Sequence, residues 1–310
     1  MKYLLVLLFS TLYSFCYSQN FDGGTKIISQ DQYVWGITQS LDKKYIAYSV
    51  GSSKTVILDA KTLTPRKTFD YNANWGGGSP QFSYNSKFMA YKIYGEKGQI
   101  GIYSITTATT FKYDLEAYDI SFFNQSSKLL YVKNGMFGIF DVLKAKDKKE
   151  LLNVNFGTRN FDASFVIDDD DKNLYSSCSD GSLKCFDMEF WKETKSYGPF
   201  STEISNMKLY GDTVLFSVGS SIYVLNVQDG KFSDVETNQN YISDLFIDEK
   251  NKEVLFCGSS SQISALSLKD LTIHPIIEKI KGENSYTVFK TNEGNLLIGD
   301  ENDLYLYKKK

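Results

Sequence analysis

Short apolar strands separated by tight turns recur along the whole chain at a nearly constant spacing. One strand of the repeat starts at residues 44, 87, 128, 172, 212, 252 and 294, so successive copies are 43, 41, 44, 40, 40 and 42 residues apart. KYIAYS, KLLYVK and KEVLFC are examples. Each copy is followed by a turn and another strand, such as TVILDA, MFGIFD and SLKCFD. Because apolar and polar positions alternate with a period of two between turn residues, the pattern predicts antiparallel hairpins.

Two further segments complete each repeat. An apolar segment such as ITQS, ISFF or DLFI lies upstream of the first hairpin strand, and a weaker strand such as RKTFD or TKSYG lies downstream. No stretch shows the capped 3.6-residue pattern of a helix, and the four prolines fall outside the predicted strand cores. Seven such units predict an all-β fold, a seven-bladed β-propeller of four-stranded antiparallel blades.

The last repeat lacks a fourth strand. It stops at Lys310, just after its third strand, while the segment TKIIS at residues 25–29 belongs to no other repeat. We expect residues 25–29 to pair into the seventh blade, because this pairing closes the ring and hides its edge strands.

Two stretches carry a resemblance to known propellers. SSCSDGSLKCFD at 176–187 resembles the second and third strands of a WD-repeat blade, and SPQFSYNSKFMAY at 79–91 is similar to TolB-like repeats. The resemblance covers nearly all of the chain after residue 18, although the copies are degenerate: Asp59, Asp141 and Asp187 keep only the acid of the Trp-Asp dipeptide. It implies a propeller of a secreted bacterial type.

The first 18 residues have the layout of a secretory signal peptide. Lys2 is followed by an apolar run from Tyr3 to Leu12, and cleavage is expected between Ser18 and Gln19. Lipidation of Cys16 is a second interpretation, although Phe15 stands where a lipoprotein signal has a small residue. The apolar run is shorter than the roughly 20 residues of a membrane span. We therefore expect export to the periplasm or outside the cell, no membrane span, and a single monomeric propeller domain at 19–310.

After cleavage, the net charge and the number of cysteines argue against a nucleic-acid partner and against a disulfide-stabilised fold. Removing residues 1–18 leaves 33 basic and 37 acidic residues, a formal net charge of −4, which gives no electrostatic reason to expect nucleic acid. Cys178, Cys185 and Cys257 remain, and an odd number does not make a disulfide scaffold.

The register of the SSCSDGSLKCFD hairpin determines how its two cysteines lie relative to each other. A two-residue Asp180-Gly181 turn would place Cys178 opposite Leu183 and Cys185 opposite Ser176. The thiols would then share one face of the sheet at a diagonal spacing of about 7–8 Å, too far apart for a disulfide. We expect two buried free thiols.

The sequence contains few of the residues that catalytic or metal sites require. The only histidine, His274, lies in the apolar run LTIHPII, which is read as a fourth strand, so Ser-His-Asp, Cys-His and zinc sites lack partners. The acidic run Asp168–Asp171 is read as a solvated turn, with a loose calcium site as the alternative. WGGGS at 75–79 lacks a following GK[ST] and is read as a connector. We expect no catalytic residue, metal or cofactor.

One end of the blades is predicted to bind the partner. The turn between the second and third strands and the connection to the next blade lie at the same end of a four-stranded meander. Trp35, Trp75 and Arg159 lie in or beside such connections, and Tyr94 lies in such a turn. Aromatic residues and arginine dominate binding hot spots, so these four are the candidate binding residues. The alternative for Trp35 and Trp75 is packing between blades.

Two functions follow from this pattern. The first is a secreted, non-catalytic propeller that binds a protein or another macromolecule through its loop-rich face. The second is a carbohydrate-active or carbohydrate-binding propeller, whose site at the mouth of the central channel would use carboxylates such as Asp180, Asp300 or Glu301 together with tyrosines.

Overall fold

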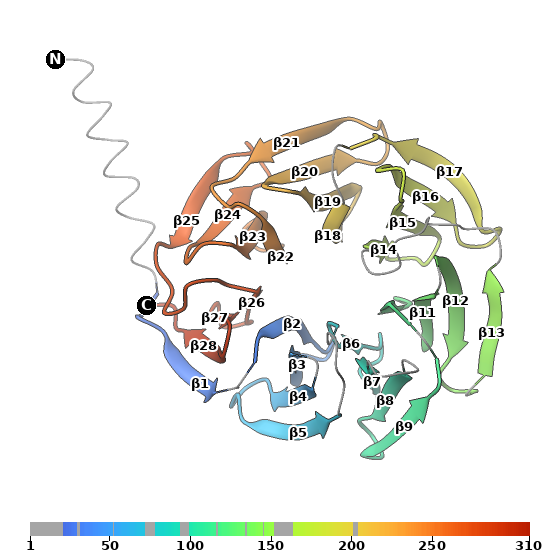
Figure 1. The fold of residues 1–310 in the computed structure, drawn as a ribbon, viewed down its shortest axis with the longest axis horizontal. Coiled ribbons are helices and arrows are strands. Elements are labelled where there is room, and N and C mark those ends of the chain that lie inside the picture. Colours follow the sequence, from blue (N-terminus) through green and yellow to red (C-terminus); the bar gives the residue numbers. More distant parts are fainter. Residues whose placement is uncertain are drawn as a thin grey trace. The chain divides into compact units, whose positions relative to one another are not determined.

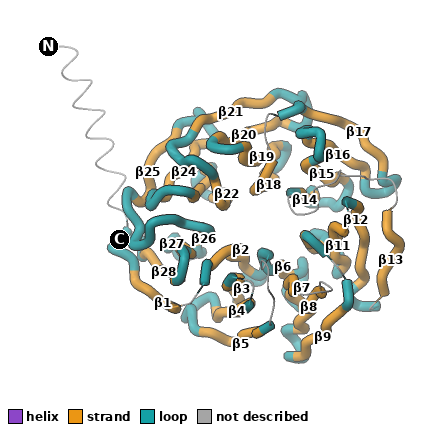
Figure 2. The backbone as a smooth tube through the Cα atoms, in the orientation of Figure 1, coloured by secondary structure: helices purple, strands orange, loops and turns teal. Residues whose placement is uncertain are grey.

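The computed structural model describes residues 21–29, 32–51, 53–71, 78–93, 99–115, 117–133, 135–144, 146–151, 164–200 and 204–310, apart from the side chains of Trp35 and of residues 146–151. These residues form strands, turns and loops (Figure 2). No helix occurs among them, so the described part of the chain contains no long apolar helix that could cross a membrane. The predicted signal peptide and Cys16 lie outside the described residues.

Seven four-stranded antiparallel sheets form the blades of a seven-bladed β-propeller (Figure 1). Blade one contains β2 (Val34–Gln39), β3 (Tyr45–Val50), β4 (Lys54–Asp59) and β5 (Pro65–Asp70). Blade two contains β6 (Gln81–Phe82), β7 (Phe88–Ile93), β8 (Gln99–Ser104) and β9 (Thr109–Tyr113). Blade three contains β10 (Asp119–Phe122), β11 (Lys128–Lys133), β12 (Met136–Asp141) and β13 (Lys146–Leu151).

The remaining blades follow the same order. Blade four contains β14 (Phe165–Ile167), β15 (Asn173–Ser177), β16 (Leu183–Asp187) and β17 (Lys192–Tyr197). Blade five contains β18 (Ile204–Tyr210), β19 (Thr213–Val218), β20 (Ser221–Asn226) and β21 (Phe232–Glu236). Blade six contains β22 (Ile242–Asp248), β23 (Glu253–Gly258), β24 (Ile263–Ser267) and β25 (Ile273–Ile277). Blade seven contains β26 (Thr287–Lys290), β27 (Leu296–Gly299), β28 (Asp303–Tyr307) and β1 (Thr25–Ser29).

The N-terminal strand completes the last blade, as predicted. β1 pairs antiparallel with β28, with Thr25 opposite Leu306 and Ser29 opposite Asp303. A salt bridge of 2.6 Å between Lys26 Nζ and Asp303 Oδ2 joins the same two strands. The outer edge of β28 is therefore covered by the other end of the chain.

Two compact units make up the chain. The terminal unit consists of Met1–Val34 and Val235–Lys310 and contains blades six and seven. The central unit, Trp35–Asp234, contains blades one to five apart from the boundary residues of β2 and β21. Each unit is described separately below.

Apolar cores lie between neighbouring blades in both units. In the terminal unit, Leu255 and Cys257 of blade six pack with Leu296 and Tyr305 of blade seven. Because a blade covered on both faces buries most residues of its middle strands, these strands read as nearly continuous apolar runs, such as YIAYSV in β3. The fourth strands β5, β9, β17 and β21 are exposed, and β5, for example, has the polar sequence PRKTFD. Polar residues protect an outer edge against unwanted pairing.

The acids at the ends of the third strands cap the next turn. Asp59 Oδ1 accepts hydrogen bonds from the backbone N–H groups of Lys61 and Thr62, at 3.1 and 3.0 Å. Asp141 and Asp187 accept the equivalent bonds in blades three and four. A side-chain oxygen that holds amides two and three residues ahead is the usual way in which Asp fixes a tight turn.

The hairpin at 176–187 differs from its predicted register by one residue. Ser177 lies opposite Leu183, and Cys185 lies opposite Tyr175. The loop is longer than a two-residue turn, because the N–H of Cys178 donates to Ser182 O at 2.9 Å. Gly181 adopts a φ of 78° inside this loop, a conformation that favours glycine.

The changed register separates the two thiols. A shift of one residue moves a side chain to the other face of a strand. Cys185 belongs to the core between blades four and five, whereas Cys178 packs against the core between blades three and four. The prediction of free thiols is confirmed, and Cys257 is free as well. Cys178 is only partly buried, contrary to the expectation of two buried thiols.

Proline placement corrects a second expectation. Pro275 lies inside β25, opposite Ser264, and Pro65 is the first residue of β5. Both are fourth strands. An outer strand has neighbours on one side only, so a missing N–H can face away from the sheet.

Candidate functional site

The four predicted binding residues are not tested by the structure. Trp75, Tyr94 and Arg159 lie outside the described residues. Trp35 is the second residue of β2, but its side chain is not described. All four therefore remain predictions.

A different group of aromatic and acidic residues meets in the terminal unit, and we call it the tyrosine–carboxylate cluster. Its members are Tyr33, Tyr241, Tyr286, Asp300 and Glu301. The three tyrosines immediately precede β2, β22 and β26, and the two acids lie in the turn between β27 and β28. Each tyrosine thus occupies the same position of the repeat, just before the first strand of a blade.

Backbone hydrogen bonds hold these segments together. The N–H of Tyr286 donates to Gly299 O at 2.9 Å, and the N–H of Val34 donates to Asp300 O at 3.0 Å. Tyr241 O accepts a bond of 3.2 Å from the N–H of Ser259. A Cβ at Gly299 would collide with the carbonyl oxygen of Val34, so this close approach requires glycine.

The tyrosine rings of the cluster are grouped and accessible. The ring centroids of Tyr33 and Tyr286 lie 4.8 Å apart with the planes at 52°. Tyr33 is 46% exposed and Tyr241 is 45% exposed. A tyrosine ring offers a flat apolar face and a polar hydroxyl, which suits a surface that is wet when free and covered when bound.

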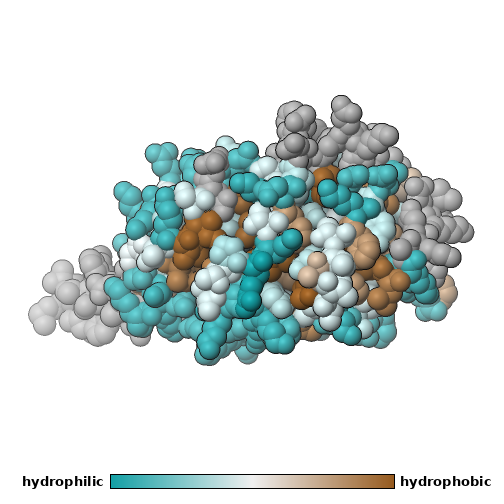
Figure 3. All heavy atoms as spheres, turned by 90° about the horizontal axis from the view of Figure 1, so that it is seen from below, coloured by the Kyte–Doolittle hydropathy of each residue, from teal (hydrophilic) through white to brown (hydrophobic). Residues whose placement is uncertain are grey.

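Four other exposed apolar residues do not form such a group, whereas Phe232 packs against Phe200 and Tyr223. Leu41, Tyr84, Leu143 and Phe190 are exposed, and each lies in a different turn of the central unit. The face seen in Figure 3 likewise shows apolar residues interspersed with hydrophilic ones. Scattered exposed apolar residues are normal on protein surfaces.

Burial and neighbouring acids shape the electrostatics of the cluster. Asp300 is 5% exposed, and its Oδ1 accepts the N–H groups of Asn302 and Asp303 at 3.0 and 2.7 Å. Burial raises the pKa of Asp300, and the carboxylates of Asp303 and Glu301 raise it further. Glu301 Oε1 accepts a hydrogen bond of 3.0 Å from Asn284 Nδ2.

The hydroxyl of Tyr286 stays protonated near neutral pH. Burial raises the pKa of Tyr286 to about 12, and Tyr241, Glu301, Tyr33 and Asp300 contribute in the same direction. The cluster therefore combines neutral aromatic rings with carboxylates, an arrangement suited to holding a ligand by stacking and hydrogen bonding.

Asp180 is the third carboxylate named for the predicted channel site. Asp180 belongs to the hairpin loop of blade four, in the central unit. Its Oδ1 accepts hydrogen bonds from the N–H and the hydroxyl of Ser182, at 2.9 and 2.5 Å. These bonds lower the pKa of Asp180. Asp180 thus stabilises its own turn.

The acidic run Asp168–Asp171 forms the turn between β14 and β15, as expected, and its carboxylates have protein partners. Asp168 Oδ1 accepts the N–H groups of Lys172 and Asn173. Asp171 accepts those of Asn124 and Gln125, at 2.6 and 2.9 Å, and so joins blades three and four. Within the described ranges, no group of three or more His, Cys, Asp or Glu residues could hold a metal ion.

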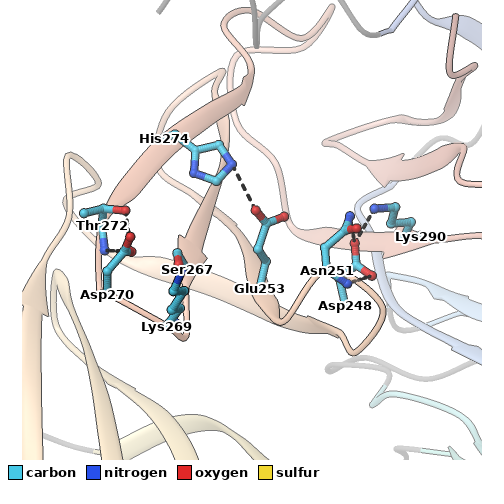
Figure 4. Close-up of polar contacts among 9 residues, drawn as sticks. All are labelled: Asp248, Asn251, Glu253, Ser267, Lys269, Asp270, Thr272, His274 and Lys290. Carbon is cyan, nitrogen blue, oxygen red and sulfur yellow. Dashed lines mark hydrogen bonds and ion pairs between the residues drawn. The ribbon is translucent and has the colours of Figure 1, made fainter. Parts of the chain in front are cut away.

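His274 lies in the fourth strand of blade six, as predicted, and faces a carboxylate (Figure 4). Its Nε2 is 3.4 Å from Glu253 Oε1. Nearby, Lys290 of blade seven reaches Asp248, which also accepts a bond from Asn251 Nδ2 at 2.8 Å. These contacts connect strands and blades to one another, which is a structural role.

The described cysteines are poor nucleophiles at neutral pH. Burial raises the pKa of the Cys178 thiol to about 11 and holds the pKa of Cys257 well above its usual value. Because the thiolate is the reactive form, thiols in such surroundings react slowly.

A shallow groove of about 470 Å³ in the central unit is a weaker candidate. It lies between β17 and the segment that leads into β21, and Tyr197 and Phe232 line it. The polar groups of this lining are already engaged: Lys195 Nζ and the Tyr197 hydroxyl both donate to Val227 O, at 2.6 and 3.0 Å. Fewer polar groups are left there for a ligand than in the tyrosine–carboxylate cluster.

A repeated tyrosine is the feature of the sequence that could have identified the cluster. Tyrosine precedes the first strand in four of the seven blades, at residues 33, 118, 241 and 286.

No protein-family model matches the chain, and no curated protein matches it either.

Proposed function

We propose that this protein is an exported, non-catalytic propeller that binds a protein partner at its tyrosine–carboxylate cluster. The observation that carries the proposal is the grouping of three tyrosines, two of them nearly half exposed, beside Asp300 and Glu301. Tyrosine is enriched among the residues that dominate binding energy. The layout of residues 1–18 and the likeness to WD-repeat and TolB-like repeats support an exported propeller of a bacterial type.

Carbohydrate binding is the second candidate function. Aromatic rings beside carboxylates also suit a sugar, whose apolar face stacks on a ring while its hydroxyls donate hydrogen bonds. Two of the three carboxylates named for that function, Asp300 and Glu301, lie in the cluster. Binding to a glycan array in the absence of any protein partner would favour this second function.

A double replacement tests the proposed function. Changing Tyr33 and Tyr241 together to alanine should reduce capture of the partner tenfold or more, because it removes the two most exposed rings of the cluster. The measurement is quantitative affinity enrichment: the propeller is immobilised, and the amount of partner that it captures from the secreted fraction of its own cells is compared between variants.

The matched control is Phe190→Ala, which removes an aromatic ring of 73% exposure from a turn of the central unit. This variant should capture the partner as the unchanged protein does. Melting temperatures within about 2 °C of the unchanged protein establish that both variants are folded. Equal capture by the double variant and the unchanged protein would rule out the cluster as the binding site.

A further inference from the structure

The two acids of the tyrosine–carboxylate cluster have no cationic partner among the described residues. Elsewhere in the terminal unit, Asp303 pairs with Lys26 at 2.6 Å and Asp248 pairs with Lys290. None of the described ion pairs includes Asp300 or Glu301. Asp248, Asp300 and Asp303 are the buried acids among the described residues of the terminal unit, and of these three only Asp300 lacks a cationic partner.

The hydrogen bonds of the two acids come from neutral groups. Asp300 Oδ1 accepts two backbone N–H groups, while its Oδ2 receives no hydrogen bond from the residues that the structure describes. Glu301 accepts one bond from the amide of Asn284. A carboxylate that is 5% exposed is poorly hydrated, so a nearby cation stabilises it more than it would a carboxylate in open water.

The rings of the cluster add a second attraction for positive charge. The face of a tyrosine ring carries partial negative charge and attracts cations placed above it. The rings of Tyr33 and Tyr286 are in contact, with centroids 4.8 Å apart and planes tilted by 52°, and Tyr33 is nearly half exposed. A neutral sugar could stack on the rings and donate hydroxyl groups to the two carboxylates, but it would supply no positive charge, and an anionic ligand would be repelled.

We propose that the tyrosine–carboxylate cluster recognises an arginine side chain presented by the protein partner. Arginine is favoured over lysine because its planar guanidinium can stack on a ring and donate to carboxylate oxygens at the same time. This inference rests on the proposed binding function and gives it a ligand chemistry. It also makes the partner basic at its point of contact, complementary to the acids of the cluster.

A pair of synthetic peptides separates charge from shape. The probes are Ac-Gly-Gly-Arg-Gly-Gly-NH2 and its citrulline analogue, a neutral side chain of nearly the same shape, and methyl β-glucoside serves as the sugar probe. Binding to the full chain is followed by NMR on ¹³C-labelled tyrosine rings, with the signals assigned from Tyr→Phe variants. We expect the arginine peptide to shift the signals of Tyr33 and Tyr286 and to bind about threefold or more tightly than the citrulline peptide.

Matched charge removals locate the effect. Glu301→Gln should weaken binding of the arginine peptide about threefold or more, whereas Glu249→Gln should leave it unchanged. Glu249 is exposed and immediately follows β22, the strand that Tyr241 precedes. Glu249→Gln therefore removes an equal charge at the other end of that strand. Raising the salt concentration should weaken the arginine peptide and leave the citrulline peptide unaffected.

Three results would overturn the inference. Equal affinity for arginine and citrulline, equal losses in the two Glu→Gln variants, or a response of the cluster tyrosines to the glucoside alone would each exclude recognition of a cation. The proposed function fails separately, when capture of the protein partner does not depend on Tyr33 and Tyr241.

Discussion

Replacing Tyr307 with alanine is expected to destabilise the protein by about 3–5 kcal/mol, as for other large buried side chains. Tyr307 is 1% exposed and belongs to the core between blades six and seven. Its ring fills the space against Gly24, where a Cβ would overlap the ring, and its hydroxyl accepts the N–H of Lys281 at 2.9 Å. One side chain therefore contacts both the N-terminal segment before β1 and the connection between two blades.

Urea unfolding of purified protein measures this effect. Tyr307→Phe is the control, because it keeps the ring and loses only the hydroxyl contact, at a cost of about 1 kcal/mol. A free energy of unfolding for Tyr307→Ala within 1 kcal/mol of the unchanged protein would contradict the described packing of the N-terminal segment on the last blade.

The second large effect is expected at Gly138. This residue lies in β12 directly opposite Tyr131 of β11, and a Cβ at Gly138 would fall within the Tyr131 ring. Tyr131 is 1% exposed and cannot move into solvent without opening the blade. Gly138→Ala should therefore destabilise the protein by an amount near the upper end of about 1–3 kcal/mol, the usual cost of overpacking a core.

A double-mutant cycle isolates this contact. In a Tyr131→Ala background the ring is absent, so adding Gly138→Ala should cost much less than it does in the unchanged protein. Thermal or urea unfolding of the four proteins gives the coupling energy. Equal costs in the two backgrounds would show that the ring of Tyr131 is not what keeps position 138 a glycine.

The blades could be predicted from the sequence because their middle strands are buried on both faces. Runs such as KLLYVK and MFGIFD became β11 and β12 almost residue for residue. The N-terminal strand was predicted from a count of strands, since the last repeat lacked one. Both inferences depend on periodicity and on the need to cover strand edges, which do not require knowledge of any single side-chain contact.

The register of one hairpin could not be predicted in the same way. The same sequence is compatible with a two-residue turn at Asp180-Gly181 and with the observed longer loop. A type I′ turn requires a positive φ at both residues, whereas only Gly181 has one here. The difference is a single residue, yet it places Cys178 and Cys185 in different cores. The pattern of apolar and polar residues therefore predicts the strands of this hairpin but not the conformation of its loop.

The tyrosine–carboxylate cluster was only partly accessible from the sequence. Asp300 and Glu301 were named together with tyrosines, but the tyrosines themselves were not identified. Tyr33 and Tyr286 come from opposite ends of the chain, and they meet because Tyr286 and Val34 bond to the adjacent carbonyl groups of Gly299 and Asp300 at the end of β27. Such a meeting depends on ring closure, which a local pattern does not describe.

Site-specific photo-crosslinking tests the central claim, that the partner binds at this cluster, most directly. A benzoylphenylalanine is placed at position 241, immediately before β22, or at position 249, immediately after β22. The two probes lie at opposite ends of one strand, so they report on opposite ends of the same blade. Crosslinking of the partner from position 241 and not from position 249 is the result we predict. Crosslinking from 249 alone would contradict the account.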